Sequence, residues 1–200
     1  MINDSNREKI KDAAINLVLT QGIFHPSTAE ITVTAGVSRT LLHYYFKDKK
    51  EIEELVCQHA MGLYRLKTQQ LFITEIGMRE RISEFSETAF AFAASYPFLD
   101  IFIITASGNN TEIQHFLTEQ NFKIQAFIKE LDMFFEENSL HDLTAEHFLI
   151  QLLSVINLPL DVIFQSIYLC ENGQRNLCTA KQYKIVLKEL IANILSKFTV

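Results

Sequence analysis

Glycine and proline are scarce along this chain, and their scarcity constrains the fold more than any other feature. Only nine of the 200 residues are glycine or proline, well below the combined share of about 12% that is usual in proteins. Because β-sandwiches and α/β folds need frequent turn residues, long helices joined by short connections are favoured. Hydrophobic residues make up 48% of the chain, enough for a folded core. We therefore expect an all-α protein with about nine helices.

The charge is unevenly divided along the sequence. Residues 1–50 contain seven Lys or Arg and five acidic residues, whereas the remaining 150 contain 11 and 19, within a total net charge of -6. A net charge of +2 on the first segment and -8 on the rest indicates that only the first segment meets a polyanion. The division favours a basic small domain followed by an acidic larger one, and we expect these domains at residues 1–47 and 48–200.

Cysteine usage and the N-terminal composition both favour a cytoplasmic protein. The three cysteines are odd in number and form no CxxC pair, which argues against a disulfide framework and a zinc ribbon. The N-terminal segment is charged and has no apolar stretch, so we expect no secretory signal. The apolar run from Ala89 to Ser107 contains Asp100 and Pro97, and we interpret it as two core helices broken at the proline rather than a membrane span.

Helix starts are predicted clearly in the first quarter of the chain. Three times a cap residue is followed three positions later by glutamate, the spacing of a capping box: Ser5 with Glu8, Ser27 with Glu30, and Asp48 with Glu51. The first helix has an apolar stripe of Ile10, Ala13, Ala14, Leu17 and Val18, and we expect Gly22 to end it. Gly36 suits a tight turn and Ser38 can cap a short helix from Arg39 to Tyr45.

Two short helices joined by a turn that contains glycine are typical of a helix-turn-helix. The run ITVTAGVSRTLLHYYFKDKKEI from Ile31 to Ile52 resembles the DNA-binding segment of the TetR family of bacterial repressors. The matching positions are Ile31, Ala35, Gly36, Val37, Ser38, Leu42, Tyr45, Phe46, Lys49 and Ile52. The sequence departs from the family pattern at Thr32, where alanine is usual, and at His43, where tyrosine is usual.

The resemblance implies an N-terminal three-helix helix-turn-helix domain that binds double-stranded operator DNA. If Leu41, Leu42 and Tyr45 face inward, the residues on the other side of the recognition helix reach base edges and phosphates. The predicted DNA-binding residues are Thr28, Arg39, Thr40, His43, Tyr44, Lys47 and Lys49. Arg39 suits a guanine, Thr40 a thymine methyl or a phosphate, and Thr28, Tyr44 and Lys49 suit phosphates. The alternative is that His43 and Tyr44 pack beside Phe46.

A single reading helix makes few contacts, so we expect a homodimer that reads two half-sites of a palindrome. The C-terminal segment has an apolar stripe with helical spacing: Tyr183, Val186, Leu187, Leu190, Ile191, Ile194, Leu195 and Phe198. The segment from Thr144 to Leu169 is apolar on more than one side. The resemblance implies that these two helices pair with their copies, and the alternative is that both stripes are used within one chain.

The larger domain is predicted to bind a small, apolar effector. Between Arg81 and Lys123 there is no Lys or Arg, while seven of the chain's 16 phenylalanines occur there, which indicates a bulky apolar interior. The resemblance implies an effector pocket, whose candidate residues are His59, Tyr64, Phe98, Asp100 and Phe102. The ligand would release the dimer from DNA by stabilising a state that no longer fits the operator.

No cofactor, metal site or catalytic motif is predicted. His141 and His147 are six residues apart with Asp142 and Glu146 nearby, a spacing that does not place both imidazoles on one helical face. No GxSxG, HExxH or phosphate-binding glycine loop occurs. Two alternatives to a ligand-responsive repressor remain open. One is a helical carrier of hydrophobic molecules or an interaction module with a vestigial DNA-binding domain, and the other is a small enzyme using His59 or His115 as base.

Overall fold

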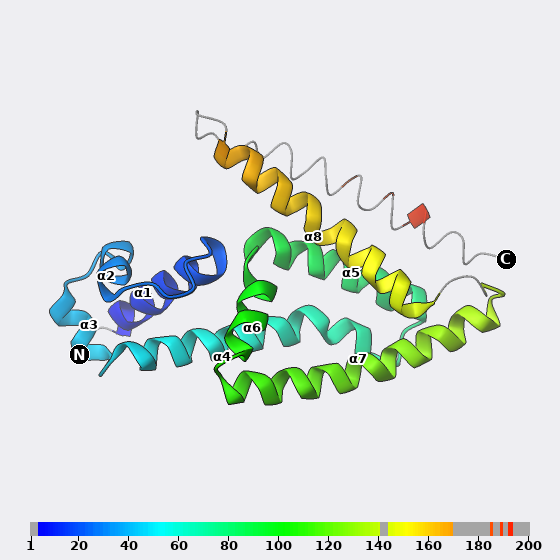
Figure 1. The fold of residues 1–200 in the computed structure, drawn as a ribbon, viewed down its shortest axis with the longest axis horizontal. Coiled ribbons are helices and arrows are strands. Elements are labelled where there is room, and N and C mark those ends of the chain that lie inside the picture. Colours follow the sequence, from blue (N-terminus) through cyan, green and yellow to red (C-terminus); the bar gives the residue numbers. More distant parts are fainter. Residues whose placement is uncertain (1–3, 141–143, 170–184, 186–188, 190–191, 194–200) are drawn as a thin grey trace. The chain divides into compact units, whose positions relative to one another are not determined.

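The computed structural model describes residues 4–140, 144–169, 185, 189, 192 and 193. Within these ranges the chain is helical and contains no strand (Figure 1). The α-helices are α1 (Asp4–Ile15), α2 (Thr28–Ala35), α3 (Arg39–Tyr45), α4 (Lys49–Thr68), α5 (Met78–Ser95), α6 (Leu99–Ser107), α7 (Thr111–Glu137) and α8 (Ala145–Leu169). A π-helical turn, η1 (Asn16–Thr20), extends α1, and a 3-10 turn, η2 (Gln69–Phe72), follows α4. The predicted all-α class is confirmed.

The chain divides by its internal contacts into two compact units. Residues 1–65 and 96–117 form the N-terminal unit, and residues 66–95 and 118–200 form the second unit. Helices α4 and α7 therefore contribute residues to both. The predicted boundary of the DNA-binding domain after residue 47 concerns function and stays a prediction.

The N-terminal unit is organised around α1, which packs on α2 and α3. The predicted stripe of α1 is confirmed, because its five residues are at most 5% exposed. The helix does not stop at Ile15 but continues through η1, whose Leu17, Val18 and Leu19 are buried. Gly22 then takes a left-handed backbone with φ +76°. The prediction that Ser5 caps α1 is wrong, because the helix already includes Asp4 and Ser5 lies inside it.

A proline separates α5 from α6, as the sequence predicted. Helix α5 ends at Ser95, α6 begins at Leu99, and Pro97 lies between them. The backbone N–H of Phe98 donates to the carbonyl of Leu19 at 3.1 Å, which attaches the start of α6 to the end of η1. Among the described residues no single helix is long and apolar enough to cross a membrane; only α5 and α6 taken together reach that length and composition.

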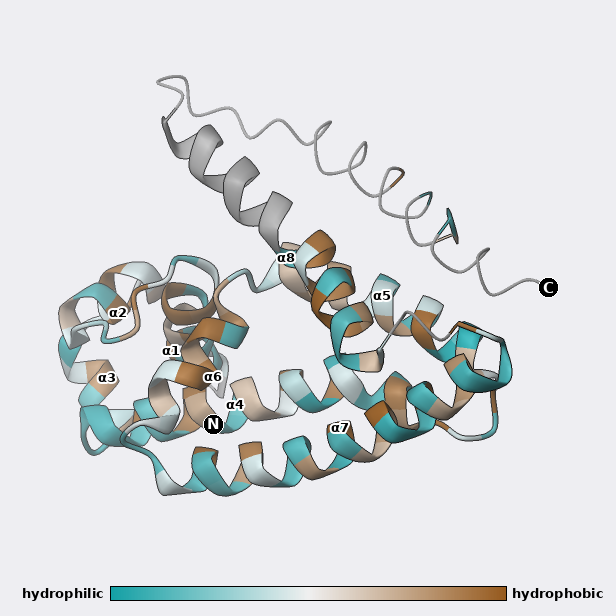
Figure 2. Ribbon diagram, turned by 45° about the vertical axis from the view of Figure 1, so that its right-hand side comes forward, coloured by the Kyte–Doolittle hydropathy of each residue, from teal (hydrophilic) through white to brown (hydrophobic). Residues whose placement is uncertain are grey.

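Aromatic side chains fill the core of the second unit. Phe85, Phe127, Phe135 and Phe148 are each at most 3% exposed and belong to one buried cluster. The rings of Phe135 and Phe148 meet edge to face with centroids 5.6 Å apart, which joins α7 to α8. In Figure 2 brown and teal residues alternate along α5 and α7, as expected of helices with one buried face. The predicted apolar interior is present, but Phe122 is not part of it, because its side chain is 78% exposed.

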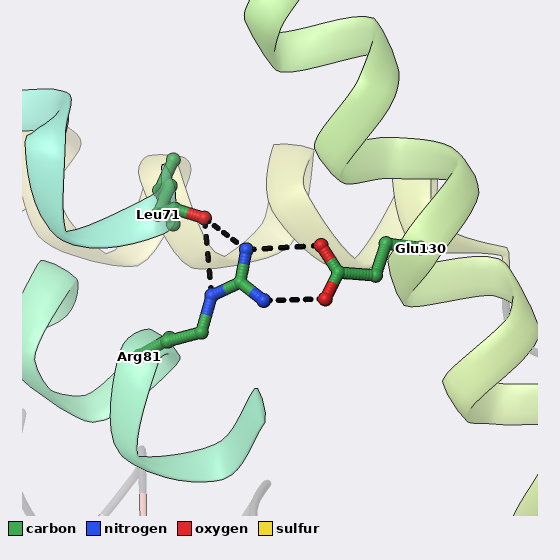
Figure 3. Close-up of polar contacts among 3 residues, drawn as sticks. All are labelled: Leu71, Arg81 and Glu130. Carbon is green, nitrogen blue, oxygen red and sulfur yellow. Dashed lines mark hydrogen bonds and ion pairs between the residues drawn. The ribbon is translucent and has the colours of Figure 1, made fainter. Parts of the chain in front are cut away.

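A buried arginine joins three elements of the second unit (Figure 3). The Arg81 guanidinium is 3% exposed and forms a two-pronged contact with the Glu130 carboxylate, with Nη2 3.0 Å from Oε2. It also donates from Nε to the carbonyl of Leu71 at 3.1 Å, and lies 5.1 Å from the ring centroid of Phe127. Because planar guanidinium groups match carboxylates in this way, Arg81 connects η2 and α5 to α7.

The start of α8 was predicted near Thr144 and is confirmed there. Thr144 Oγ1 accepts from the His147 N–H at 3.3 Å, and Asp132 Oδ1 accepts from the Ala145 N–H at 2.7 Å. His147 is exposed at this turn. His141, Asp142 and the eight residues of the predicted C-terminal stripe lie outside the described residues.

Candidate nucleic-acid interface

The first helix of the candidate interface, α2, is fixed by a complete capping box. Ser27 Oγ accepts from the Glu30 N–H at 3.2 Å, and the Glu30 carboxylate accepts from the Ser27 N–H at 2.7 Å. These hydrogen bonds lower the pKa of Glu30, chiefly through the Ser27 backbone N–H, and the nearby charge of Lys49 lowers it further. The predicted box is therefore present and keeps α2 anchored at its N-terminus.

Gly36 makes the turn between α2 and α3. Its backbone is left-handed, with φ +65°, a conformation that costs most other residues free energy. The Val37 N–H donates to the Thr32 carbonyl at 3.1 Å, which satisfies the last turn of α2. Two residues after Gly36, Ser38 Oγ accepts from the Leu41 N–H at 3.2 Å and begins α3. The glycine-containing turn predicted for a helix-turn-helix is thus formed.

Helix α3 has a buried side and a solvent side. Leu42 and the following Phe46 are both 0% exposed, and the Arg7 guanidinium of α1 lies 5.3 Å from the Phe46 ring centroid. Four residues on the other side are exposed: Arg39, Thr40, His43 and Tyr44. Since they occupy positions i, i+1, i+4 and i+5, they share one helical face. Tyr44 is 62% exposed and touches Tyr45, not Phe46, with ring centroids 5.2 Å apart.

The remaining predicted DNA-binding residues differ in exposure. Lys47 is exposed, and Thr28 is half-buried as the first residue of α2. Lys49 is half-buried, and its Nζ lies 3.0 Å from Glu53 Oε1, one turn along α4. A phosphate at this position would therefore compete with an existing carboxylate partner.

Two exposed residues near this face were not predicted from the sequence. Val33 of α2 is 81% exposed, and the side chain of Lys50 is 79% exposed although it lies 3.6 Å from Glu54 Oε1. The sequence carried a signal for Val33: it is two residues from the buried Ile31, which places it about 200° around the helix.

The five residues predicted for an effector pocket all lie in the N-terminal unit. Phe98 packs against Phe24, with ring centroids 6.3 Å apart, and Tyr64 packs edge to face on Phe116 at 5.7 Å. Burial raises the pKa of Tyr64, and the negative charge of Asp100 raises it further. Burial and the positive charge of Lys11 lower the pKa of His59, and Asp12 opposes them. Of the five, Phe102 lines a cavity in this unit.

The described residues contain no group of three or more His, Cys, Asp or Glu side chains that could hold a metal ion. His115, one of the two histidines of the enzyme alternative, is exposed on α7. Cys57 is a buried free thiol with a raised pKa, mainly because of desolvation. The strongest chemical feature of the unit is therefore the outward face of α3.

Comparison with known proteins agrees with this reading of the first quarter of the chain. Residues 10–55 match the model of the bacterial regulatory proteins, tetR family. Over 84 residues the chain is 30% identical to the HTH-type transcriptional regulator BetI of Rhizobium meliloti (strain 1021), a match that covers 42% of this chain and 41% of that protein. The similarity thus spans about two fifths of the length of the relative.

Two solved structures resemble the chain over nearly its whole length. One is a TetR-like transcriptional regulator from Rhodococcus sp. RHA1, with a TM-score of 0.56, 15% identity and 98% of both chains covered. The other is from Clostridium perfringens and is assigned as a fatty acid metabolism regulator, with a TM-score of 0.51, 20% identity, and 96% of this chain and 99% of that chain covered. At these identities they support the fold alone.

Proposed function

The chain belongs through residues 10–55 to the tetR family of bacterial regulatory proteins, and from this premise we propose that it is a transcriptional repressor. In this proposal it binds palindromic operator DNA as a homodimer in the cytoplasm, and a small, apolar effector releases it. It carries out no catalysis and needs no cofactor.

The observation that carries the proposal is the outward face of α3. Four side chains that can bond bases or phosphates project from one side of a helix whose other side is anchored by the buried Leu42. A helix of this length fits the major groove. Arg39 is assigned to a guanine, because a guanidinium can donate to both O6 and N7. Thr28, Thr40, His43, Tyr44, Lys47 and Lys49 are assigned to neighbouring bases and phosphates.

Helix α8 supports the homodimer. Its inner side contributes Phe148, Leu152 and Ile156 to the core of the second unit, at 2% exposure or less. Ile150, on another side of the same helix, is 62% exposed. An apolar residue outside the core is consistent with a second contact surface on α8, to which the predicted C-terminal stripe would add.

Selection of genomic fragments by the full-length protein, followed by fluorescence anisotropy at several salt concentrations, tests DNA binding. A specific site should bind far more tightly than random DNA, and its affinity should fall steeply with salt because phosphate contacts release counterions. Equally weak binding to every sequence would contradict the proposal and favour a carrier of hydrophobic molecules with a vestigial DNA-binding domain.

Two substitutions separate base reading from phosphate binding. Arg39→Ala should cost about 1 to 3 kcal/mol at one base pair and relax the preference there, whereas Lys49→Ala should weaken all sequences and flatten the salt dependence. Lys129→Ala is the matched control, since it removes a positive charge from an exposed position of α7 in the second unit. An unchanged operator preference in the Arg39 variant refutes the guanine contact, and an unchanged salt slope in the Lys49 variant refutes the phosphate contact.

A further inference from the structure

A cavity of about 240 Å³ lies within the N-terminal unit, behind the DNA-reading helices. Its walls come from α1, η1 and the loop after it, α2, α4, α6 and the turn between α6 and α7, all of which belong to this unit. The apolar part of the lining includes Ala14, Val18, Ile31, Ile52, Val56 and Phe102, each at most 6% exposed. These buried residues form the inner wall of the cavity, whereas His25, Thr105 and Asn109 of the lining are exposed, so the cavity opens to solvent.

The polar residues of the lining include one ion pair, whose charges cancel. These polar residues are His25, Lys49, Glu53, Cys57, Thr105, Asn109 and Asn110. Lys49 and Glu53 both line the cavity and pair with each other at 3.0 Å. Cys57 also lines it, and burial raises the pKa of its thiol, so this group stays uncharged near neutral pH. Because the charges of Lys49 and Glu53 are paired with each other, the lining favours an uncharged molecule.

One amide in the lining, that of Asn110, donates a hydrogen bond to a weak acceptor. Asn110 Nδ2 donates to Cys57 Sγ at 3.8 Å, and thiol sulfur is a weak acceptor. The oxygen of the same amide is fully engaged, since Oδ1 accepts from the backbone N–H groups of Glu112 and Ile113 at the start of α7. The amide orientation is thus fixed by the helix cap, and its NH₂ group is directed at Cys57, another residue of the lining. A carbonyl or ether oxygen would be a better acceptor than the thiol.

The volume sets the size of the ligand. A dry protein cavity of about 150 Å³ binds benzene, so about 240 Å³ accommodates a substituted single ring. We propose that this cavity is a binding site for a small, uncharged, mainly apolar molecule with one hydrogen-bond-accepting oxygen, which Asn110 recognises.

The same site can regulate DNA binding, a step that rests on the proposed function. The cavity lining includes Ile31 of α2 and Lys49, the first residue of α4 and a proposed phosphate contact. A ligand placed among α1, α2 and α4 touches the elements that support α3. The ligand can therefore alter the position of the outward face of α3. Its binding should lower operator affinity in proportion to its preference for the DNA-free state of the protein.

Acetophenone and ethylbenzene are matched probes, because they have nearly the same shape and only acetophenone carries an acceptor oxygen. We expect acetophenone, titrated into full-length protein, to shift the NMR signals of the Ile31 and Ile52 methyl groups, which line the cavity. Ile82 and Ile156 are the internal controls, since they are 0% exposed in the core of the second unit. Shifts confined to Ile82 and Ile156, or no shifts up to the solubility limit, would overturn the site.

Asn110→Asp is the decisive variant. Aspartate keeps the oxygen that caps α7 and removes the NH₂ donor, so the helix start is preserved. We expect about tenfold tighter binding of acetophenone than of ethylbenzene in the wild type, and equal binding of the two in Asn110→Asp. Equal affinities in the wild type would overturn the role of Asn110 and the ligand class. Ala106→Phe, which fills the cavity from the end of α6, should abolish the shifts from both probes.

Operator anisotropy measured with and without saturating acetophenone tests the regulatory step. A loss of affinity in the wild type that Ala106→Phe no longer shows supports it. Unchanged operator affinity at saturation overturns regulation through this cavity. Failure of the ligand-free protein to bind any operator is a separate result, which would contradict the proposed function itself.

Discussion

Two glycines with a left-handed backbone differ in what surrounds them. Gly36 has φ +65° and no atom within 4 Å of an added Cβ, whereas at Gly22, with φ +76°, an added Cβ would lie 2.9 Å from the Phe98 ring. Gly36→Ala should lower the free energy of unfolding by about 1 to 2 kcal/mol through backbone strain. Gly22→Ala should lose about 1 to 3 kcal/mol more, because the Phe98 ring must move.

Urea unfolding of both variants measures the difference. The Phe98 ring has little freedom to retreat, because its backbone N–H is bonded to Leu19 and its ring packs on Phe24. An equal loss in the free energy of unfolding of the two variants would mean that the Phe98 ring moves without an energetic penalty.

His59 should make the protein less stable in mild acid. Burial, assisted by the charge of Lys11, lowers its pKa below the ordinary value of 6.5. The unfolded chain therefore binds a proton more readily than the folded chain, and stability falls as pH drops from 6.5 toward the lowered pKa. His59→Gln should remove this part of the pH dependence, as measured by urea unfolding between pH 7.5 and pH 5. Parallel curves for the variant and the wild type would assign the acid sensitivity to other groups.

Single residues also mark the limit of what the sequence could predict about the candidate site. Exposure of Arg39, Thr40, His43 and Tyr44 followed from helical spacing once Leu42 was assigned to the core. The Lys49–Glu53 pair has i,i+4 spacing and was open to prediction, but whether a lysine prefers its glutamate or a phosphate depends on the bound DNA. The Asn110–Cys57 contact joins residues 53 positions apart, and no local pattern indicates it.

At the scale of elements, the sequence predicted helix starts reliably where the hydrogen bonds that fix them join residues close in the chain. The starts of α2, α3 and α4 were readable because Ser27, Ser38 and Asp48 each accept a bond from a backbone N–H three residues later. The π-helical turn η1 was not readable. Its carbonyl at Leu19 accepts from Phe98, so its surroundings depend on a segment far along the chain.

Among the contacts between elements, we expect the Arg81 cluster, in which Arg81 contacts Leu71, Phe127 and Glu130, to contribute most to the free energy of unfolding. Glu130→Gln leaves a buried guanidinium with a weaker partner, and we expect a loss of about 1 to 3 kcal/mol in the free energy of unfolding. The cost is at the lower end if water replaces part of the contact, since the Glu130 side chain is 49% exposed. Arg81→Lys should also destabilise, because an ammonium cannot form the two-pronged contact.

Glu119→Gln is the matched control for the Arg81 cluster. It removes the same charge from the same helix, but Glu119 pairs with Lys123 where both side chains are about half exposed. Exposed pairs of this kind contribute little, and the expected change is below about 0.5 kcal/mol. Thermal and urea unfolding should show a clearly larger loss of stability in Glu130→Gln than in Glu119→Gln. Equal losses in the two variants would contradict a special role of Arg81.

At the scale of the whole molecule, the charge distribution fits a protein that meets DNA with one small region only. The net charge is -6, so the proposed phosphate binding requires a local set of basic residues at suitable positions. Composition and periodicity predicted the all-α fold because few turn residues leave few alternatives. The cavity depends on packing between distant segments, which composition does not encode.

Dimerisation should determine both affinity and salt dependence. In the proposed homodimer, α3 of each copy would neutralise its own set of phosphates, and the slope of log affinity against log salt is proportional to the total number. Replacing Leu190 and Ile194 of the predicted C-terminal stripe with glutamate should give monomers in sedimentation and about half the wild-type slope. Ala192→Glu is the control, because Ala192 is exposed and lies off the stripe. A double variant that stays dimeric places the interface elsewhere, and a monomer that keeps the full slope means that one copy alone makes all the phosphate contacts.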